Sequence, residues 1–292
     1  MLGSCAGGGL PQWNCGGPQS LRARAGDPAL PPREQAGLAV SADGLRWSLL
    51  GASPDLRQQL AGFPGLHPRP GTRAVPLDTV VLTCAELDHV LGILLLREAL
   101  SFRILSTAWV RDALLEGAPF RLLEPAWGVA ALDRPLPLDP AGRLELRLFP
   151  VAPKVPGFLR GRVASPRETT VGARITESAT GRRLVFAPSL GALDSGVLAE
   201  LAAADCRFVD GTFFTEGELR ALRPGAPDAV AMGHLPIAGP GGSLEQLAKL
   251  PGRTFYLHMN NTNPILDSAS RQRAAVERAG IEVAEDGAEF EV

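Results

Sequence analysis

The sequence has few cysteines and no long apolar run. Its 292 residues include only four cysteines, Cys5, Cys15, Cys84 and Cys206. Because they are scattered and form no C-x-x-C pair, we expect neither a disulfide framework nor a four-cysteine zinc site. The apolar run 90–96 is far shorter than the ~20 residues that a membrane span needs, so no spanning segment is expected.

An excess of positive charge is also absent. The formal net charge is -2, the isoelectric point is near 6.1, and no Lys/Arg cluster is interleaved with aromatic residues. Nucleic acid is therefore not an expected partner. The opening "LGSCAGGGL" lacks the charged start and the ~7–15-residue apolar stretch of a signal peptide. We expect a soluble cytoplasmic protein.

The sequence does contain an alternation of strand-like and helix-like segments. Runs rich in Val, Leu, Ile and Phe predict strands at 46–53, 78–84, 102–107, 143–151, 170–176, 182–187, 205–210 and 253–259. Helical spacing predicts helices at 89–100, 108–117, 194–204, 241–250 and 268–280. This alternation indicates an α/β layered fold, which we take as one domain over residues 1–292.

Two segments depart from this alternation. Residues 16–37 have almost no apolar period, and we expect a loose surface segment there. The Pro/Gly-rich stretch 153–166 is long for an idle connection, and we interpret it as a loop over a site. A flexible excursion without a role is the alternative for this second stretch.

Histidine is scarce as well, and its positions favour a metal site. His89 and His258 follow predicted strands, Asp210 closes another, and Asp88 precedes His89. Layered α/β folds gather ligands outside the carboxyl ends of strands, so these four side chains are expected to converge. Two imidazoles with one or two carboxylates suit an iron, manganese or zinc site with open coordination positions. Each residue also has a structural interpretation, as a hydrogen-bonded turn residue or a helix cap.

Two further features lie in glycine-rich segments. His234, in "AMGHLPIAGPGG", is either an acid or base that faces a substrate or a histidine in a surface loop. The opening "LGSCAGGGLPQWNC" matches neither G-x-G-x-x-G nor G-x-x-x-x-G-K-[ST] after a strand, so no dinucleotide-binding unit is expected. We interpret it as a tight loop near the site.

Several of these segments together resemble, in order and spacing, the coenzyme PQQ synthesis protein B family of the metallo-β-lactamase superfamily. The resemblance runs nearly from end to end of the chain. The segments that carry it are "LGSCAGGGLPQWNC", "ASPDLRQQL", "AELDHVLGILLLRE", "PKVPGFL", "ETTVG", "VDGT", "MGHL" and "HMNNTNPIL".

The resemblance implies an αββα four-layer sandwich with a metal at one edge, and a place in the biosynthesis of pyrroloquinoline quinone (PQQ). Hydrolytic members of the superfamily carry H-x-H-x-D-H, whereas Cys84 and Glu86 stand at the two leading positions here. A dinuclear zinc hydrolase is therefore not expected. The remaining ligands resemble a single-metal site: Asp88, His89, Asp210 and His258.

In this family such a site is associated with an iron-dependent hydroxylase that oxidises the tyrosine ring of a Glu-Tyr unit derived from the precursor peptide. Fe(II) is thus the expected metal, with Zn or Mn as alternatives, and His234 and Glu86 are the expected catalytic residues. Alternative functions are a carrier of PQQ or its precursor to the periplasm and a zinc-dependent hydrolase. The candidate substrate-binding residues are Lys154, Thr170, Asn260, Asn261, Thr262 and Asn263.

The implied partners are a small peptide-derived substrate and other PQQ synthesis proteins, with a homodimer as a further option. The sequence departs from the family in one motif. The family's structural zinc knuckle, C-x-C-x-x-C, keeps only Cys15 here, since Gly17 and Ser20 replace the later cysteines. We expect this structural zinc to be lost.

Overall fold

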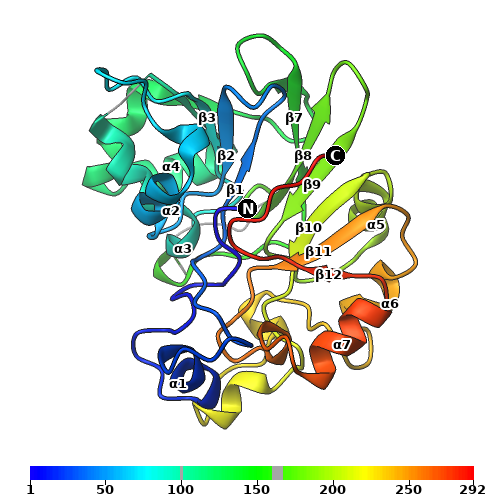
Figure 1. The fold of residues 1–292 in the computed structure, drawn as a ribbon. Coiled ribbons are helices and arrows are strands. Elements are labelled where there is room, and N and C mark those ends of the chain that lie inside the picture. The colour runs from blue at the N-terminus through cyan, green and yellow to red at the C-terminus, as the bar shows by residue number, and fades with distance from the viewer. Residues whose placement is uncertain (99–100, 160–166) are drawn as a thin grey trace.

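The computed structural model describes residues 1–98, 101–159 and 167–292, and it contains two β-sheets packed face to face (Figure 1). The first sheet has five strands in sequence order: β1 (Leu38–Val40), β2 (Trp47–Leu50), β3 (Leu77–Val81), β4 (Arg103–Ser106) and β5 (Trp127–Val129). β1 is antiparallel to β2, and the following strands are parallel to one another.

The second sheet has the order β12-β11-β10-β9-β8-β7-β6. β6 to β9 pair antiparallel, and β9 to β12 pair parallel. Its strands are β6 (Leu136–Pro137), β7 (Leu144–Pro150), β8 (Val171–Glu177), β9 (Arg183–Ala187), β10 (Cys206–Asp210), β11 (Arg253–Leu257) and β12 (Glu282–Val283).

Helices cover the outer faces of both sheets (Figure 1). α2 (Leu56–Gly62) and α4 (Ala108–Leu115) lie against the first sheet, and α5 (Ser195–Ala202), α6 (Ser243–Leu247) and α7 (Arg271–Arg278) lie against the second. The remaining helices are α1 (Pro18–Arg24), α3 (Leu87–Val90) and the 3-10 helices η1 (Pro64–Leu66), η2 (Leu91–Glu98), η3 (Ala118–Ala126), η4 (Gly157–Leu159), η5 (Glu218–Ala221), η6 (Val230–Met232) and η7 (Pro264–Leu266).

Three separate apolar cores fill the spaces between the four layers. Strand residues alternate between cores because successive side chains point to opposite faces of a sheet. Val80 joins the core under α2 and α4, whereas its neighbour Val81 joins the core between the sheets. Phe208 and Val209 divide in the same way between the central core and the core under α5 to α7. The expected αββα arrangement is therefore confirmed.

Every strand and helix that the sequence predicts has a counterpart, but one helix has a different geometry. The segment predicted as a helix at 89–100 forms one turn of α-helix, α3, followed by the 3-10 helix η2, and residues 99–100 lie outside the described part. Gly92 explains a close approach there, since a Cβ at this position would lie 2.0 Å from the Ser53 carbonyl oxygen. The loop predicted at 153–166 is described only to Leu159.

The prediction of a loose segment at 16–37 is wrong. This segment forms α1 and buries Leu30 completely. The Gln19 amide donates to the Asn263 carbonyl oxygen at 2.8 Å, and Arg22 pairs with Asp267 at 2.6 Å. Polar contacts with residues distant in sequence order the segment, and an apolar period cannot report such contacts.

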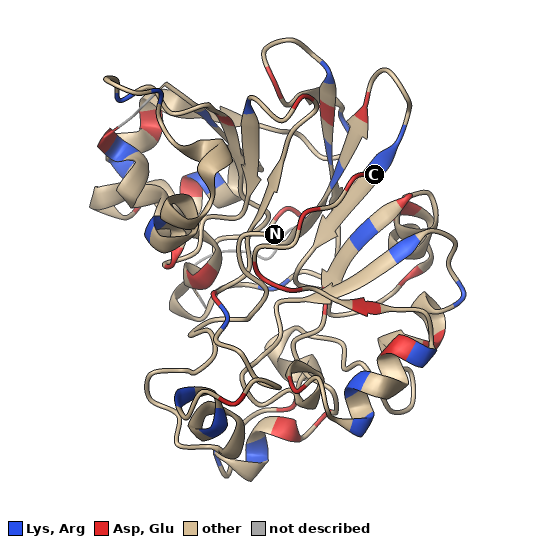
Figure 2. Cartoon of the chain, in the orientation of Figure 1, with Lys and Arg blue, Asp and Glu red and all other residues tan. Residues whose placement is uncertain are grey.

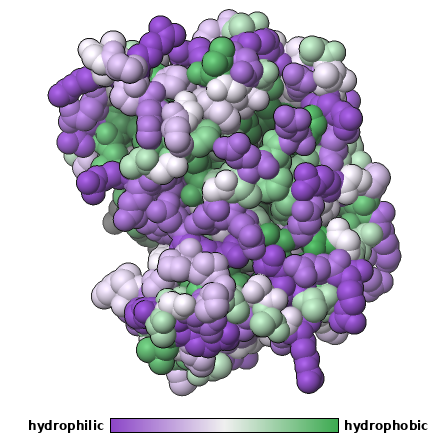
Figure 3. Space-filling view, viewed as in Figure 1, coloured by the Kyte–Doolittle hydropathy of each residue, from purple (hydrophilic) through white to green (hydrophobic). Residues whose placement is uncertain are grey.

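Charge is mixed over the surface, with Lys/Arg and Asp/Glu interspersed on the helices in the view of Figure 2. On the same face, polar side chains dominate the outer surface and apolar ones lie mostly deeper (Figure 3). Among the described residues, no helix combines the length and apolar character that a membrane crossing requires.

Candidate metal centre

The candidate site lies where strands of both sheets end. Asp88 and His89 belong to α3, which follows β3 of the first sheet. Asp210 is the last residue of β10, and His258 directly follows β11. Because β10 and β11 run parallel with Asp210 opposite Leu257, the two side chains leave the same edge of the second sheet. The sequence-based expectation that these four residues converge is supported by this placement.

Three donor atoms of these residues form a compact triangle. The His258 Nε2 atom lies 3.0 Å from His89 Nε2 and 3.1 Å from Asp88 Oδ2, and the last two atoms are 3.9 Å apart. Bonds of about 2.0–2.2 Å to one tetrahedral ion place neighbouring ligand atoms about 3.3–3.6 Å apart. The triangle therefore fits a single metal ion, and two imidazoles with one carboxylate leave further coordination positions open.

The backbone holds two sides of this triangle in specific conformations. His258 has a φ of 58°, in the left-handed region that few residues other than glycine adopt, and histidine is among the more tolerant. Such strained positions cluster at functional sites. The glycine-rich loop reaches Asp88 from the other side, since a Cβ on Gly7 would lie 3.2 Å from Asp88 Oδ2. The predicted tight loop near the site is thus confirmed.

Burial sets the protonation of the ligands. His89 is 2% exposed, and burial lowers its pKa to about 4, so the imidazole is neutral at pH 7 and free to bind a cation. Burial raises the pKa of Asp88, but the neighbouring imidazoles and Lys154 outweigh it and hold the pKa below its usual range. Both groups are therefore in the ionisation state that metal binding requires.

Asp210 lies beside this triangle and is already saturated with hydrogen bonds. Its Oδ1 accepts from the Thr212 amide at 2.9 Å and the Thr212 hydroxyl at 2.6 Å. Its Oδ2 accepts from the Leu190 amide and from His234 Nδ1, both at 2.7 Å. Four donors occupy both oxygens, and Asp210 lies next to the triangle of Asp88, His89 and His258. Direct metal binding by Asp210 stays a prediction.

Asp210, His234 and His258 form a second cluster of potential metal ligands, beside the triangle. Hydrogen bonds account for the closeness of Asp210 and His234. Burial raises the pKa of Asp210, but His234 and the other donors lower it to a net value below the usual range. His234 is 5% exposed, and burial lowers its pKa. A neutral imidazole that donates to a carboxylate accounts for this contact without a second ion.

A row of polar residues continues from His234 to Lys154 and Glu86. Lys154 Nζ lies 3.1 Å from His234 Nε2 and 3.5 Å from Glu86 Oε1. Since an ammonium group only donates, His234 Nε2 accepts this bond and its Nδ1 carries the proton given to Asp210. Lys154 and Glu86 are partly exposed, with 22% of each side chain accessible, so both can face a bound molecule.

The other substrate-binding candidates support loops. The Thr170 hydroxyl, which is buried, donates to the Lys154 carbonyl oxygen at 3.1 Å. In the run 260–263, Asn261 and Asn263 are buried, and their amides donate to Ser20 Oγ at 3.0 Å and to the Gly211 carbonyl oxygen at 2.6 Å. These contacts give the buried residues a structural role, and substrate binding by them stays a prediction.

Asn260 and Thr262 are half-buried members of the same run. The Asn260 amide donates to Thr262 Oγ1 at 2.6 Å, and that hydroxyl donates to Glu218 Oε1 at 2.5 Å. Substrate binding by these two residues stays a prediction. Thr212, which contacts Asp210, His234 and His258, was not singled out by the sequence analysis.

Cys84 and Cys15 belong to neither group of potential metal ligands found among the described residues. Cys84 is 1% exposed, and burial raises the pKa of its thiol. Cys15 Sγ accepts a hydrogen bond from the Gly17 amide at 3.3 Å. The segment 16–37, which follows Cys15, is held by its polar contacts with Asn263 and Asp267.

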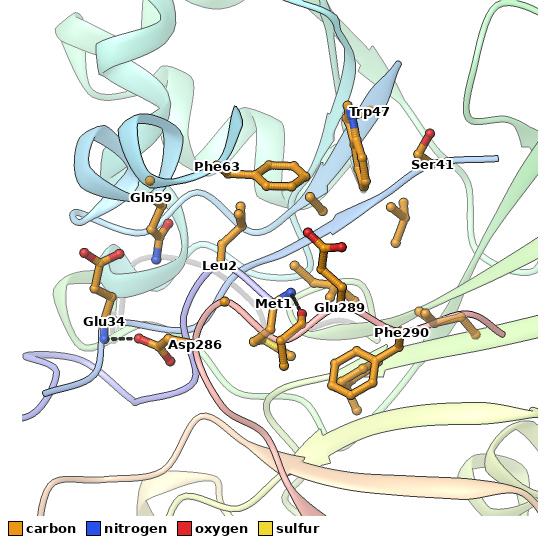
Figure 4. A pocket seen from close by; sticks show the side chains of 18 of the residues that line it. Met1, Leu2, Glu34, Ser41, Trp47, Gln59, Phe63, Asp286, Glu289 and Phe290 are labelled. Atoms are coloured by element: carbon orange, nitrogen blue, oxygen red, sulfur yellow. Dashed lines mark hydrogen bonds between the residues drawn. The ribbon is translucent and has the colours of Figure 1, made fainter. Parts of the chain in front are cut away.

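A cavity of about 1550 Å³ lies in another part of the molecule, between the two ends of the chain. Figure 4 shows Met1, Glu289 and Phe290 in its wall, with Trp47 and Phe63 at one side. Asp88, His89 and His258 do not line it. The candidate chemistry therefore depends on the metal triangle and not on this cavity.

Comparisons with known proteins identify the family of the chain. A family model described as "Beta-lactamase superfamily domain" matches residues 46–259. Coenzyme PQQ synthesis protein B of Methylobacterium nodulans is 43% identical over 98% of this chain and 97% of its own, and that of Methylococcus capsulatus is 41% identical over 99% and 98%. The crystal structure of zinc-bound PqqB from Methylobacterium extorquens has a TM-score of 0.93 at 37% identity and covers 100% of this chain and 98% of that one. The chain belongs to the coenzyme PQQ synthesis protein B family of the β-lactamase superfamily.

Proposed function

We propose that the protein is a metal-dependent enzyme of PQQ synthesis that hydroxylates the tyrosine ring of a Glu-Tyr unit, with one iron held by Asp88, His89 and His258. Family membership assigns the chain to PQQ synthesis. The finer activity is supported chiefly by the triangle of two imidazoles and one carboxylate, which leaves positions open for oxygen and substrate. The relative from Methylobacterium extorquens binds zinc, and these ligand types accept iron, manganese and zinc alike.

The metal is required because no side chain activates dioxygen unaided; bound iron would supply that chemistry. The protein's own groups bind and orient the substrate. Lys154, partly exposed beside the triangle, is placed to bind a substrate carboxylate. When Lys154 turns to the substrate, His234 Nε2 loses its donor and can accept a proton, while Asp210 keeps the ring oriented through Nδ1. Glu86 restrains Lys154 from the other side.

Metal stoichiometry after anaerobic loading with ferrous iron tests the site. We expect about one iron per chain, and loss of that iron in both His89→Ala and His258→Ala because each removes one of three ligands. The matched control is His67→Ala, since His67 is exposed and its Nε2 atom lies 3.0 Å from the Ala61 carbonyl oxygen, outside the triangle. Iron retained in either ligand variant would refute the proposed triangle.

Turnover then separates the candidate activities. Iron-loaded protein given a Glu-Tyr peptide, oxygen and an external two-electron reductant should insert one oxygen atom into the tyrosine ring and release the other as water. Lys154→Ala should raise KM more than it lowers kcat because binding is lost. Oxygen-independent hydrolysis of a phosphodiester or thioester by zinc-loaded protein would favour the hydrolase alternative. Tight retention of PQQ without metal-dependent turnover would favour a carrier.

A further inference from the structure

We infer that Thr212 positions His258 for metal binding by fixing which ring nitrogen of His258 carries the proton. The inference rests on the proposed metal site, because it concerns how one of its ligands is held. Thr212 follows β10 and is 3% exposed. Its hydroxyl lies within hydrogen-bond distance of three side chains, those of Asp210, His234 and His258.

The Thr212 hydroxyl has one proton and two lone pairs to share among these neighbours. Asp210 Oδ1, at 2.6 Å, is a carboxylate oxygen and can only accept, so the hydroxyl donates its proton there. The oxygen then faces ring nitrogens with its lone pairs. His258 Nδ1 lies 2.9 Å away and must act as the donor in this contact.

His234 does not need the same oxygen. Its Nδ1 lies 2.7 Å from Asp210 Oδ2 and 3.0 Å from Thr212 Oγ1, so the carboxylate is the nearer and stronger acceptor for its proton. Its Nε2 accepts from Lys154. The Thr212 hydroxyl is therefore free to serve His258.

With the Nδ1 proton given to Thr212, Nε2 is the ring atom left to bind a cation, which displaces the hydrogen that Nε2 donates to Asp88 Oδ2 in the metal-free protein. That Nε2 atom is the one that points into the triangle, 3.0 Å from His89 Nε2 and 3.1 Å from Asp88 Oδ2. A metal-binding histidine commonly donates its other ring N–H to an acceptor, which fixes tautomer and orientation. The chain Asp210, Thr212, His258 provides this arrangement through a hydroxyl.

The other imidazole ligand has no equivalent support in the described part of the chain. His89 Nδ1 is buried and has no hydrogen-bond partner there. Thr212 is itself firmly held. Its carbonyl oxygen accepts from the backbone amide of Asn260 at 2.9 Å, and its own backbone amide donates to Asp210. The hydroxyl thus has a fixed position from which it can orient His258.

The test compares Thr212→Val, Thr212→Ser and a control, Thr79→Val. Valine keeps the shape of threonine but offers no acceptor, whereas serine keeps the hydroxyl. Thr79 is also buried, and its hydroxyl donates at 2.7 Å to the Leu138 carbonyl oxygen. The first readout is the ¹⁵N spectrum of the ring nitrogens in metal-free protein, which distinguishes the tautomers. With four histidines in the chain, assignment by substitution is practical.

We expect His258 to carry its proton on Nδ1 in the unsubstituted protein, in Thr212→Ser and in Thr79→Val, and to lose this preference in Thr212→Val. The second readout is the Kd for Zn²⁺, which we expect to weaken about 10–100-fold in Thr212→Val, to recover in Thr212→Ser and to be unchanged in Thr79→Val. An unchanged tautomer in folded Thr212→Val overturns the inference. Absence of Zn²⁺ and Fe²⁺ binding by the unsubstituted protein would instead refute the proposed metal site, while the tautomer readout still decides the role of Thr212.

Discussion

Gly7 limits how the Asp88 carboxylate can lie. A methyl group at this position would lie 3.2 Å from Asp88 Oδ2 and 3.3 Å from its Cβ, closer than ordinary van der Waals contact. We therefore expect Gly7→Ala to displace the carboxylate and weaken Zn²⁺ binding about tenfold, because a ligand must sit within tenths of an ångström of its place. Isothermal titration measures this, with Gly16→Ala as the control, since a Cβ at Gly16 meets nothing within 4 Å. Equal affinities of the two variants would contradict the constraint.

At the residue scale, the sequence predicts which histidines and carboxylates converge better than it predicts the groups that support them. His89 and His258 stand out because histidine is scarce and both follow apolar strands. The role of Thr212 depends on which nitrogen of His258 faces it, 46 positions later in the chain, and no local pattern encodes that contact. The same holds for Asp210: its position at a strand end is predictable, but the four donors that occupy it are not.

Among the helices, η2 packs against its neighbours only because residue 92 has no side chain. An added Cβ would lie 2.0 Å from the Ser53 carbonyl oxygen and 2.7 Å from Leu56 Cβ. Gly92→Ala is expected to lower the free energy of unfolding by about 1–3 kcal/mol, or more, through overpacking. Gly62→Ala in α2, which meets nothing within 4 Å, should be neutral or stabilising because alanine favours helices. Denaturant melts of both variants measure the difference, and equal stabilities would contradict it.

The contact between η5 and the 260–263 run should depend on pH. Burial raises the pKa of Glu218, which accepts from Thr262 Oγ1 and the Phe214 amide, to about 7. A folded-state pKa above the ordinary 4.5 means that the folded state binds the proton more tightly. The stability that the folded protein gains from this proton is fully present below about pH 4.5 and is lost as pH rises through about 7.

Glu218→Gln should therefore gain stability relative to the unsubstituted protein as pH rises from 5 to 8, by an amount on the order of 3 kcal/mol at most. Thermal melts across this pH range measure the trend. Glu245→Gln removes the same charge from an exposed side chain, with 87% of it accessible, and should show no such trend. A difference between Glu218→Gln and the unsubstituted protein that is constant with pH would contradict the shift.

At the element scale, the predicted segments differ from the observed ones mainly where segments are short. β1, β5, β6 and β12 have two or three residues each, too few to display a period, and they form because longer strands offer them an edge. The spacing in 91–98 suits either helix type, and close packing at Gly92 accompanies the 3-10 form. Packing thus decides between conformations that the local sequence allows.

For the whole molecule, the order of layers can be predicted from the sequence because strands and helices alternate. Successive strand residues belong to different cores because their side chains point to opposite faces of the sheet. The segment 16–37 shows the limit of this approach. Its contacts with 260–267 are polar and join positions more than 240 residues apart, as between Gln19 and Asn263 or Arg22 and Asp267. Hydropathy describes burial of apolar faces and carries no signal for such pairs.

The metal triangle joins the two halves of the sandwich, because Asp88 and His89 follow a strand of the first sheet and His258 follows a strand of the second. A metal that binds only the folded chain adds about 2.7 kcal/mol of stability at a free concentration of about 100 times its Kd. For a chain of this size we expect Tm to rise by several degrees when Zn²⁺ is added to metal-free protein, and by nothing in His258→Ala. His67→Ala should respond as fully as the unsubstituted protein, since that ring lies outside the triangle. Differential scanning calorimetry measures the shift. An equal rise in His258→Ala would show that the ion binds elsewhere and does not link the two sheets.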